Sequence, residues 1–366
     1  MIPLLISCEL IVDVDVPFES KQVTANAFIN PDSAWSVQLN LNRDILDPEP
    51  FQEINDAQVI IFDGATAIDT LMNTGPGHFR SDNERPEPGK TYDLFVNAPP
   101  YGDVRASTSI PVPSAITSID VYESIANQSS MLKVKMADNG AEANFYEIFL
   151  ELESEYYNYV DKKIESRGHK TQMISKDPTI QDDAEMYYSS ILFKDLLFNG
   201  KEVELTFELS GGGLSHHGMI SLTLKTLTEE GYHYLKSRRL QDMSSGDPFA
   251  QPVTVYNNIE NGFGIFAGYS ASVYKRSTTP KPVILKVAPT KGKPGDHIII
   301  TGENFIASPN QYASVSFTGQ QYPVHAQIVQ LSSTQIEVIV PDQAITGNII
   351  FQNGRVAVSG SEFSVQ

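Results

Sequence analysis

Three histidines near the middle of the chain are the residues whose types could hold a metal ion. His216 and His217 follow the glycine run Gly211–Gly213, and His233 lies a short way downstream. Three imidazoles could bind zinc if they converged. Adjacent residues of a strand point to opposite faces, so His216 and His217 could share a metal only from a loop. The glycine run lacks the Lys-Ser/Thr ending of a phosphate loop, and we interpret it as a hairpin tip.

Other polar groups form no recognisable catalytic set. The sequence contains neither a Gly-x-Ser-x-Gly elbow nor a His-Glu-x-x-His motif. An acidic group, Asp177, Asp182, Asp183 and Glu185, could bind calcium, but it lacks the ligand spacing and turn glycine of an EF-hand loop. We interpret it as a solvated charged loop. The sequence therefore predicts a protein that is not an enzyme and that needs no cofactor.

Aromatic side chains suggest binding instead of catalysis. Faces of tyrosine and tryptophan can stack on sugar rings, and they serve cores and protein interfaces equally well. The candidates are Trp35, Tyr156, Tyr157, Tyr159, Tyr187 and Tyr188. Because successive strand residues alternate between faces, one tyrosine of each adjacent pair should point inward. Core packing is the favoured interpretation, and stacking on a ligand remains the alternative.

The single cysteine, Cys8, lies almost at the start of the chain. The segment Leu5-Ile6-Ser7-Cys8 resembles a bacterial lipobox, in which the cysteine is acylated. A basic region is missing and the apolar run is shorter than in an ordinary signal peptide, which predicts a start codon upstream. In the alternative interpretation, Ile2–Ile6 is a first strand and Cys8 is a small buried residue. The lipobox interpretation makes Cys8 a lipidation site and residues 1–7 the remnant of a signal peptide.

Charge and composition narrow the classes of partner. The 45 acidic and 26 basic residues leave a formal charge of −19, which disfavours a nucleic-acid partner. A hydrophobic fraction of 41% with 10% aromatics is typical of a folded chain rich in strands. Apolar runs after Cys8 are of strand length, far short of the ~20 residues of a spanning helix. We therefore expect membrane attachment only through the lipid.

Short β-rich runs separated by turn signals predict tandem β-sandwich domains, so the fold class is mainly β. Proline-bearing stretches at Ile110–Ser114 and Ser277–Pro282 predict the boundaries between domains. One short helix is expected in the middle domain, since Thr228 precedes two glutamates and Tyr232, Leu235 and Leu240 approximate an apolar face. The expected organisation is a lipidated tether at 8–20, a β-sandwich at 21–113, a middle β domain at 116–275 and a third domain at 281–366.

The third domain has the clearest pattern. A strand at Pro282–Pro289 is followed by Gly292 and Gly295 as a hairpin turn, and then by His297–Phe305 with Gly302 at the strand exit. This segment resembles an IPT/TIG domain, which implies an immunoglobulin-like fold. Such domains occur in very different proteins, so the resemblance does not decide the function.

Residues 8 to about 275 resemble uncharacterised lipoproteins of Bacteroidota that are classified as a domain of unknown function. The resemblance rests on the Ser-Cys8-Glu start with Asp13-Val-Asp-Val-Pro17, Pro88-Gly-Lys-Thr-Tyr92, Phe193-Lys-Asp-Leu-Leu-Phe-Asn-Gly200, Asp247-Pro-Phe-Ala-Gln-Pro-Val253 and Asn257-Asn-Ile-Glu-Asn-Gly-Phe-Gly-Ile-Phe-Ala-Gly-Tyr-Ser270. We interpret the last segment as structural, with turn or bulge positions at Asn261, Gly262 and Gly264 and core contacts at Ile265 and Phe266.

The second resemblance implies a partner. Proteins of this kind look like cell-surface partners of TonB-dependent outer-membrane transporters. The sequence thus predicts a surface-exposed outer-membrane lipoprotein that acts as a non-catalytic accessory or docking subunit, with an integral β-barrel and other surface lipoproteins as partners. The alternative is a lipoprotein that binds glycans or nutrients at the cell surface.

Overall fold

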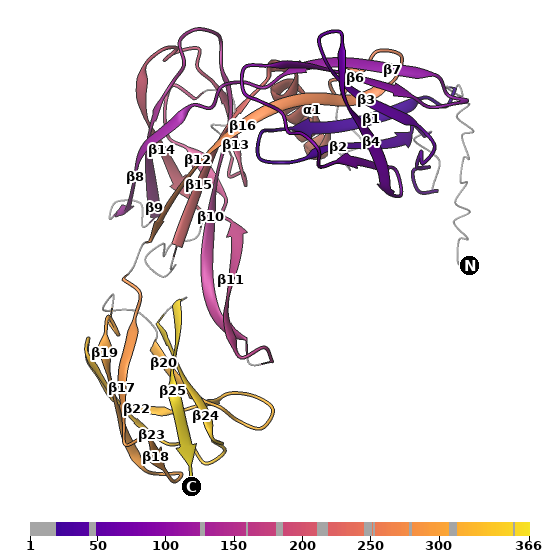
Figure 1. The fold of residues 1–366 in the computed structure, drawn as a ribbon. Helices are drawn as coiled ribbons and strands as arrows, with labels where there is room; N and C mark the ends of the chain where they lie inside the picture. The colour runs from indigo at the N-terminus through magenta and orange to yellow at the C-terminus, as the bar shows by residue number, and fades with distance from the viewer. Residues whose placement is uncertain are drawn as a thin grey trace, which may run out of the picture. The chain divides into compact units, whose positions relative to one another are not determined.

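The computed structural model describes residues 20–43, 49–124, 129–158, 160–180, 186–210, 219–244, 251, 253–277, 280–306, 313–353 and 356–366. Within these ranges the chain is mainly β, with one helix (Figure 1). None of the helical segments described here combines the length and apolar character required to cross a lipid bilayer. The expectation of a mainly β fold is confirmed.

The chain divides into two compact units that are not continuous in sequence. The first contains residues 1–109 and 237–268, and the second contains residues 110–236 and 269–366. This differs from the predicted middle domain at 116–275, because residues 237–268 group with the N-terminal sandwich. The physical reason is a strand pairing across more than two hundred residues, in which Thr24–Ile29 lies parallel to Phe263–Gly268.

Among the described residues, the first unit contains seven strands and the first part of an eighth. In sheet order the neighbours are β16-β1-β2-β5-β4-β3-β6-β7. The strands are β1 (Val23–Ile29), β2 (Trp35–Leu41), β3 (Gln58–Asp63), β4 (Thr66–Gly75), β5 (His78–Ser81), β6 (Thr91–Asn97), β7 (Asp103–Ser109) and β16 (Phe263–Ser277). Buried and exposed residues alternate along β2, β6 and β7, which is the pattern of strands with one face in the core.

A close approach between β16 and β1 explains the glycine in the middle of the pairing. Gly264 has a φ of +116°, and a Cβ added there would lie 2.0 Å from the Ala25 carbonyl oxygen. Only glycine fits such a position. Asn258 fixes the same strand, because its side chain accepts a hydrogen bond from the Phe266 N–H at 2.9 Å and donates one to the Phe266 carbonyl at 2.8 Å.

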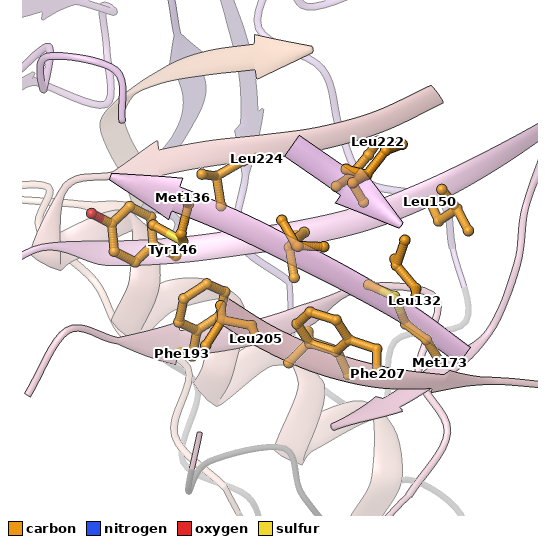
Figure 2. Close-up of a cluster of buried hydrophobic side chains, with 14 of the residues drawn as sticks. Leu132, Met136, Tyr146, Leu150, Met173, Phe193, Leu205, Phe207, Leu222 and Leu224 are labelled. Atoms are coloured by element: carbon orange, nitrogen blue, oxygen red, sulfur yellow. The ribbon is translucent and has the colours of Figure 1, made fainter. Parts of the chain in front are cut away.

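The middle region of the second unit is a two-layer sandwich. One sheet has the order β12-β14-β9-β8, and the facing layer is formed by β11, β10, β15 and the second half of β16, with β13 also paired to β10. The bounds are β8 (Ala115–Ser124), β9 (Ser129–Ala137), β10 (Phe145–Asn158), β11 (Lys163–Lys170), β12 (Met173–Ser175), β13 (Ile191–Lys194), β14 (Glu202–Leu209) and β15 (Met219–Leu227). Side chains from both layers, including Leu132, Phe207 and Leu222, form one buried cluster (Figure 2).

The one described helix, α1 (Glu229–Ser244), begins where the sequence predicts. Thr228 Oγ1 accepts a hydrogen bond from the Gly231 N–H at 3.3 Å, as an N-cap does. Tyr232 is fully buried and Leu235 is partly buried against the same cluster. Leu240 is 48% exposed, so the predicted apolar face does not extend to it. The helix ends at Ser244.

The C-terminal sandwich has two sheets, with the orders β17-β19-β23-β22 and β18-β25-β24-β20-β21. Its strands are β17 (Val283–Ala288), β18 (Lys291–Gly292), β19 (His297–Glu303), β20 (Ala313–Phe317), β21 (Val324–His325), β22 (Gln327–Leu331), β23 (Gln335–Ile339), β24 (Gly347–Asn353) and β25 (Val356–Val365). Its core includes Ile298, Ile300 and Phe305 from the predicted motif. Gly302 lies against the Val283 carbonyl and the Phe305 ring, which confirms its place at the strand exit.

Candidate functional site

The outward face of β3, β6 and β7 in the first unit carries a row of unlike side chains. Ile60 pairs with Phe95, Phe95 pairs with Arg105, and Arg105 forms an isolated bridge with Glu260. Residues directly opposite in antiparallel pairs point to the same side of a sheet. The register therefore places an aliphatic group, an aromatic ring, a guanidinium and a carboxylate side by side.

A second row lies beside the first, because Phe62 pairs with Asp93 and Asp93 pairs with Ser107. The two rows enclose an open hollow of about 390 Å³. We call the surface formed by Ile60, Phe62, Asp93, Phe95, Arg105, Ser107 and Glu260 the recognition face. At its margin the β3–β4 turn contains Gly64 and Ala65, and no atom lies within 4 Å of where a Gly64 Cβ would be. The small turn residues leave this side of the hollow open.

Charged groups on the recognition face are available for an external partner. Within the described ranges, no hydrogen bond or ion pair engages the side chains of Asp93, Arg105 or Glu260. The Arg105 guanidinium lies over the Phe95 ring, 4.6 Å from its centroid. It is therefore held above an aromatic surface with its N–H groups free to donate, an arrangement that suits a carboxylate ligand.

Glu260 reaches this face from a segment whose other residues are structural. The backbone of Glu260 exchanges hydrogen bonds with that of Arg105, at 2.8 and 3.3 Å. A few residues further on, Ile265 and Phe266 are buried, which confirms that they supply core contacts. The segment thus connects β7 with β1 and places the Glu260 carboxylate on the outward face.

Sequence reasoning did not find Asp93, Phe95, Arg105 or Glu260 as site residues. One signal was available, since Tyr92, Leu94 and Val96 alternate as the buried residues of β6 and an aromatic on the other phase must face outward. The remaining members come from different strands, and only the register brings them together.

The predicted metal candidates are not brought together. His216 and His217 lie outside the described residues. His233 is on α1, where its Nε2 is 3.4 Å from Glu229 Oε1. In the part of the chain that the structure describes, no three His, Cys, Asp or Glu side chains form a metal-binding group. Of the acidic group, Asp177 accepts hydrogen bonds from Thr179 at 2.6 and 2.9 Å, and the others fall outside the described residues.

The predicted aromatic candidates divide between core and surface. Trp35 is 1% exposed and packs edge-on against Tyr92, with ring centroids 5.0 Å apart, so it cannot stack on a ligand. Tyr156 and Tyr187 are exposed, and each donates its hydroxyl to a glutamate at 2.9 Å. Tyr188 packs against the middle core. Tyr159 and Cys8 lie outside the described residues, so the lipidation site remains a prediction.

The fold is that of a mainly β protein whose chain ends in an immunoglobulin-like sandwich. Residues 10–275 match the model of the family described as "Domain of unknown function (DUF4249)", and the chain belongs to this family. Residues 282–365 match the IPT/TIG domain, which confirms the predicted C-terminal domain. No curated protein matches the chain.

Solved structures match only in part. A protein of unknown function from Bacteroides thetaiotaomicron is 16% identical, with 24% of this chain and 22% of that chain covered and a TM-score of 0.22. An auxiliary nutrient binding protein from Bacteroides ovatus is 21% identical, with 24% and 21% covered and a TM-score of 0.20. The surface glycan-binding protein PbSGBP-B from Prevotella bryantii is 10% identical, with 69% and 42% covered and a TM-score of 0.23. In each case, the match covers less than half of the other chain.

Proposed function

We propose that this protein is a non-catalytic accessory subunit that docks through its recognition face onto an integral outer-membrane β-barrel of the TonB-dependent transporter type. A lipid on Cys8 holds it at the outer membrane, facing the cell exterior, where other surface lipoproteins join the complex. The observation that carries the docking role is that the charged side chains around Phe62 and Phe95 form no hydrogen bond or ion pair within the described residues. The choice of a transporter rests on the sequence resemblance.

The chemistry of the recognition face favours a protein partner over a sugar. Arginine and aromatic residues are both enriched in protein interfaces, and arginine is among the residues that often dominate the binding energy. The guanidinium of Arg105 also covers the Phe95 ring, so this ring is not free to stack on a pyranose. The open form of the hollow suits a protruding loop of a partner. That loop should present a carboxylate to Arg105 and a cation to Asp93 or Glu260.

The test is recovery of the partner from native membranes. Tagged full-length protein is purified in mild detergent, and accompanying proteins are identified by mass spectrometry. We expect one outer-membrane barrel in stoichiometric amount, and we expect Arg105→Glu to abolish its recovery. The matched control is Arg43→Glu, because Arg43 stacks on Phe51 at 4.4 Å in the same unit but away from the hollow.

Two outcomes would contradict the proposal. If the wild-type protein is recovered alone, the accessory role is wrong. If Arg105→Glu recovers as much barrel as Arg43→Glu does, docking does not use the recognition face. The anchor is tested separately with Cys8→Ser in the Arg105→Glu background, where docking is lost, and this change should move the protein out of the membrane fraction. A double variant that stays membrane-bound would refute lipidation at Cys8.

A further inference from the structure

The C-terminal sandwich carries a second hollow at one end, formed by two loops. One loop follows β20 and the other follows β23, and their residues 320–325 and 342–345 line a space of about 690 Å³. This volume lies within the range of small-ligand pockets, roughly 300–1,000 Å³. We call it the loop hollow. It belongs to one sandwich only and shares no residue with the recognition face.

The lining of the loop hollow excludes several ligand classes. It contains no lysine or arginine, so it offers no fixed cation to a phosphate, a sulfate or a uronic acid. Asp342 is its single carboxylate, too few for a cation site of hard oxygen ligands. Gln320, Gln321 and Gln343 contribute three side-chain amides to its lining. Each amide both donates and accepts hydrogen bonds, as a ligand rich in neutral hydroxyls requires.

Tyr322 adds an aromatic surface to these amides. It is 73% exposed, and its hydroxyl has no hydrogen-bond partner among the residues that the structure describes. Two of the other exposed tyrosines, Tyr156 and Tyr187, each donate the hydroxyl to a glutamate, and Tyr322 is far more exposed than either. An exposed, unengaged ring beside planar amides can stack on the apolar face of a sugar while its polar tip bonds a hydroxyl.

The backbone holds Tyr322 in this exposed position. Ser316 pairs with His325, and their side chains lie 3.0 Å apart between Oγ and Nδ1. Gly319 lies so close to the Tyr322 backbone that an added Cβ would be 2.1 Å from the Tyr322 carbonyl oxygen. A hydrogen bond joins the second loop to the first, because the Ile345 N–H donates to the Thr318 carbonyl at 2.8 Å. A site whose loops are already fixed loses little conformational entropy on binding.

We propose that the loop hollow binds a neutral oligosaccharide, with Tyr322 as the stacking platform and the glutamine amides as hydroxyl partners. The protein then contacts a glycan through its C-terminal sandwich and a membrane protein through its first unit. This gives the IPT/TIG domain a ligand-binding role. Binding of the glycan does not require the docking partner, so the two activities can be lost independently.

The experiment uses the full chain in mild detergent on a glycan array that carries neutral, uronic-acid and sulfated oligosaccharides. Affinity is then measured by calorimetry for the neutral hexasaccharide with the strongest signal. We expect Tyr322→Ala to weaken binding by about tenfold or more and Tyr322→Phe to retain most of it, because the ring supplies the stacking. Tyr187→Ala is the matched control, since Tyr187 is also exposed and should leave the affinity unchanged.

Three results would overturn the proposal: binding to no neutral glycan, binding only to anionic glycans, or equal affinity of Tyr322→Ala and wild type. Misfolding is a small risk at so exposed a side chain, and the melting temperature of each variant checks it. Arg105→Glu should bind the hexasaccharide as wild type does. That result keeps a failure of docking separate from a failure of glycan binding.

Discussion

Two sheet faces of this protein each place a cation over a phenylalanine ring, but only on one of them does the cation also pair with a carboxylate. On the outer face of β10 and β15, Phe149 lies beneath two lysines, with Lys170 Nζ 3.7 Å and Lys225 Nζ 5.4 Å from its centroid. Lys225 also donates to Glu147 at 2.9 Å. We call this surface the closed face. On the recognition face, Arg105 likewise stacks on Phe95, yet neither it nor the neighbouring carboxylates has a charged partner in the described chain.

The difference shows how to separate stabilising charges from recognising ones. A cation that stacks on a ring and pairs with a buried carboxylate has its interactions satisfied inside the fold, so removing it exposes an unpaired group. A cation that stacks on a ring and pairs with nothing costs the fold little when it is removed. Substitutions on the closed face should therefore change stability, and those on the recognition face should change binding.

The largest effect is expected within the segment 257–270, which contains both kinds of residue. Gly264→Ala places a methyl group against the Ala25 carbonyl at a φ of +116°. Strain and overpacking together should lower the free energy of unfolding by about 3 kcal/mol or more. Glu260→Gln, in the same segment, should change it by less than about 0.5 kcal/mol. Urea unfolding of both variants measures the contrast.

A control for this prediction is Gly89→Ala. Gly89 also has a positive φ of +81°, but no atom lies within 4 Å of an added Cβ. It should lose only about 1–2 kcal/mol, from backbone strain alone. Equal losses at Gly89 and Gly264 would show that the contact between β16 and β1 contributes nothing.

The closed face should respond next most strongly. Lys225→Met removes the hydrogen bond to Glu147, whose side chain is only 12% exposed, and leaves that carboxylate without its nearest cation. We expect a loss of about 2–3 kcal/mol in the free energy of unfolding, because hydrogen bonds to charged groups are stronger than neutral ones. Partner recovery from membranes should not change. A stable Lys225→Met protein would contradict the assignment of this face.

The recognition face should show the reverse behaviour. Arg105→Ala removes a single exposed cation–π contact, so the unfolding free energy should fall by less than about 1 kcal/mol. Affinity for the isolated barrel should fall by about 30-fold, the effect of losing a hot-spot residue of about 2 kcal/mol. Biolayer interferometry at two salt concentrations measures both the affinity and the electrostatic share of it.

The smallest expected effect is a dependence of stability on pH. Burial of Glu147 opposes its ionisation, but the charge of Lys225 and the hydrogen bond from it lower the pKa of Glu147 below its ordinary value of 4.5. The unfolded chain then takes up the proton first as the pH falls. The stabilisation is present above pH 4.5 and is lost as the pH falls through the lower pKa of the folded state. Glu147→Gln should therefore differ most from wild type at neutral pH and least in acid, as urea unfolding at several pH values will show.

Sequence patterns predicted those elements whose residues alternate strongly or carry a turn signal. Residues 35–41 alternate between hydrophobic and polar side chains and form β2, and the C-terminal motif placed Gly302 and Phe305 correctly. β4 shows little pattern to detect, because six of its ten residues are exposed and only Asp69 and Leu71 are buried. β22 is similar, with no fully buried residue.

Long-range pairing was the information that local patterns could not supply. Nothing in residues 21–113 indicates that they require a parallel neighbour from residues 263–268. The predicted middle domain at 116–275 therefore included residues that pair with the first unit. The recognition face depends on the same kind of information, since Phe95, Arg105 and Glu260 meet only through strand register. Trp35 illustrates the converse, because core packing was the favoured interpretation of this residue and its buried place in β2 confirms it.

The most direct test of the central claim is site-specific photo-crosslinking in living cells. A photoreactive residue replaces Ser107, which is exposed at the recognition face, and in a parallel strain it replaces Ser36, which is exposed on β2. We expect Ser107 to yield a crosslink to an outer-membrane β-barrel and Ser36 to yield none. A barrel crosslinked from Ser36 alone, or from neither position, would contradict docking through the recognition face.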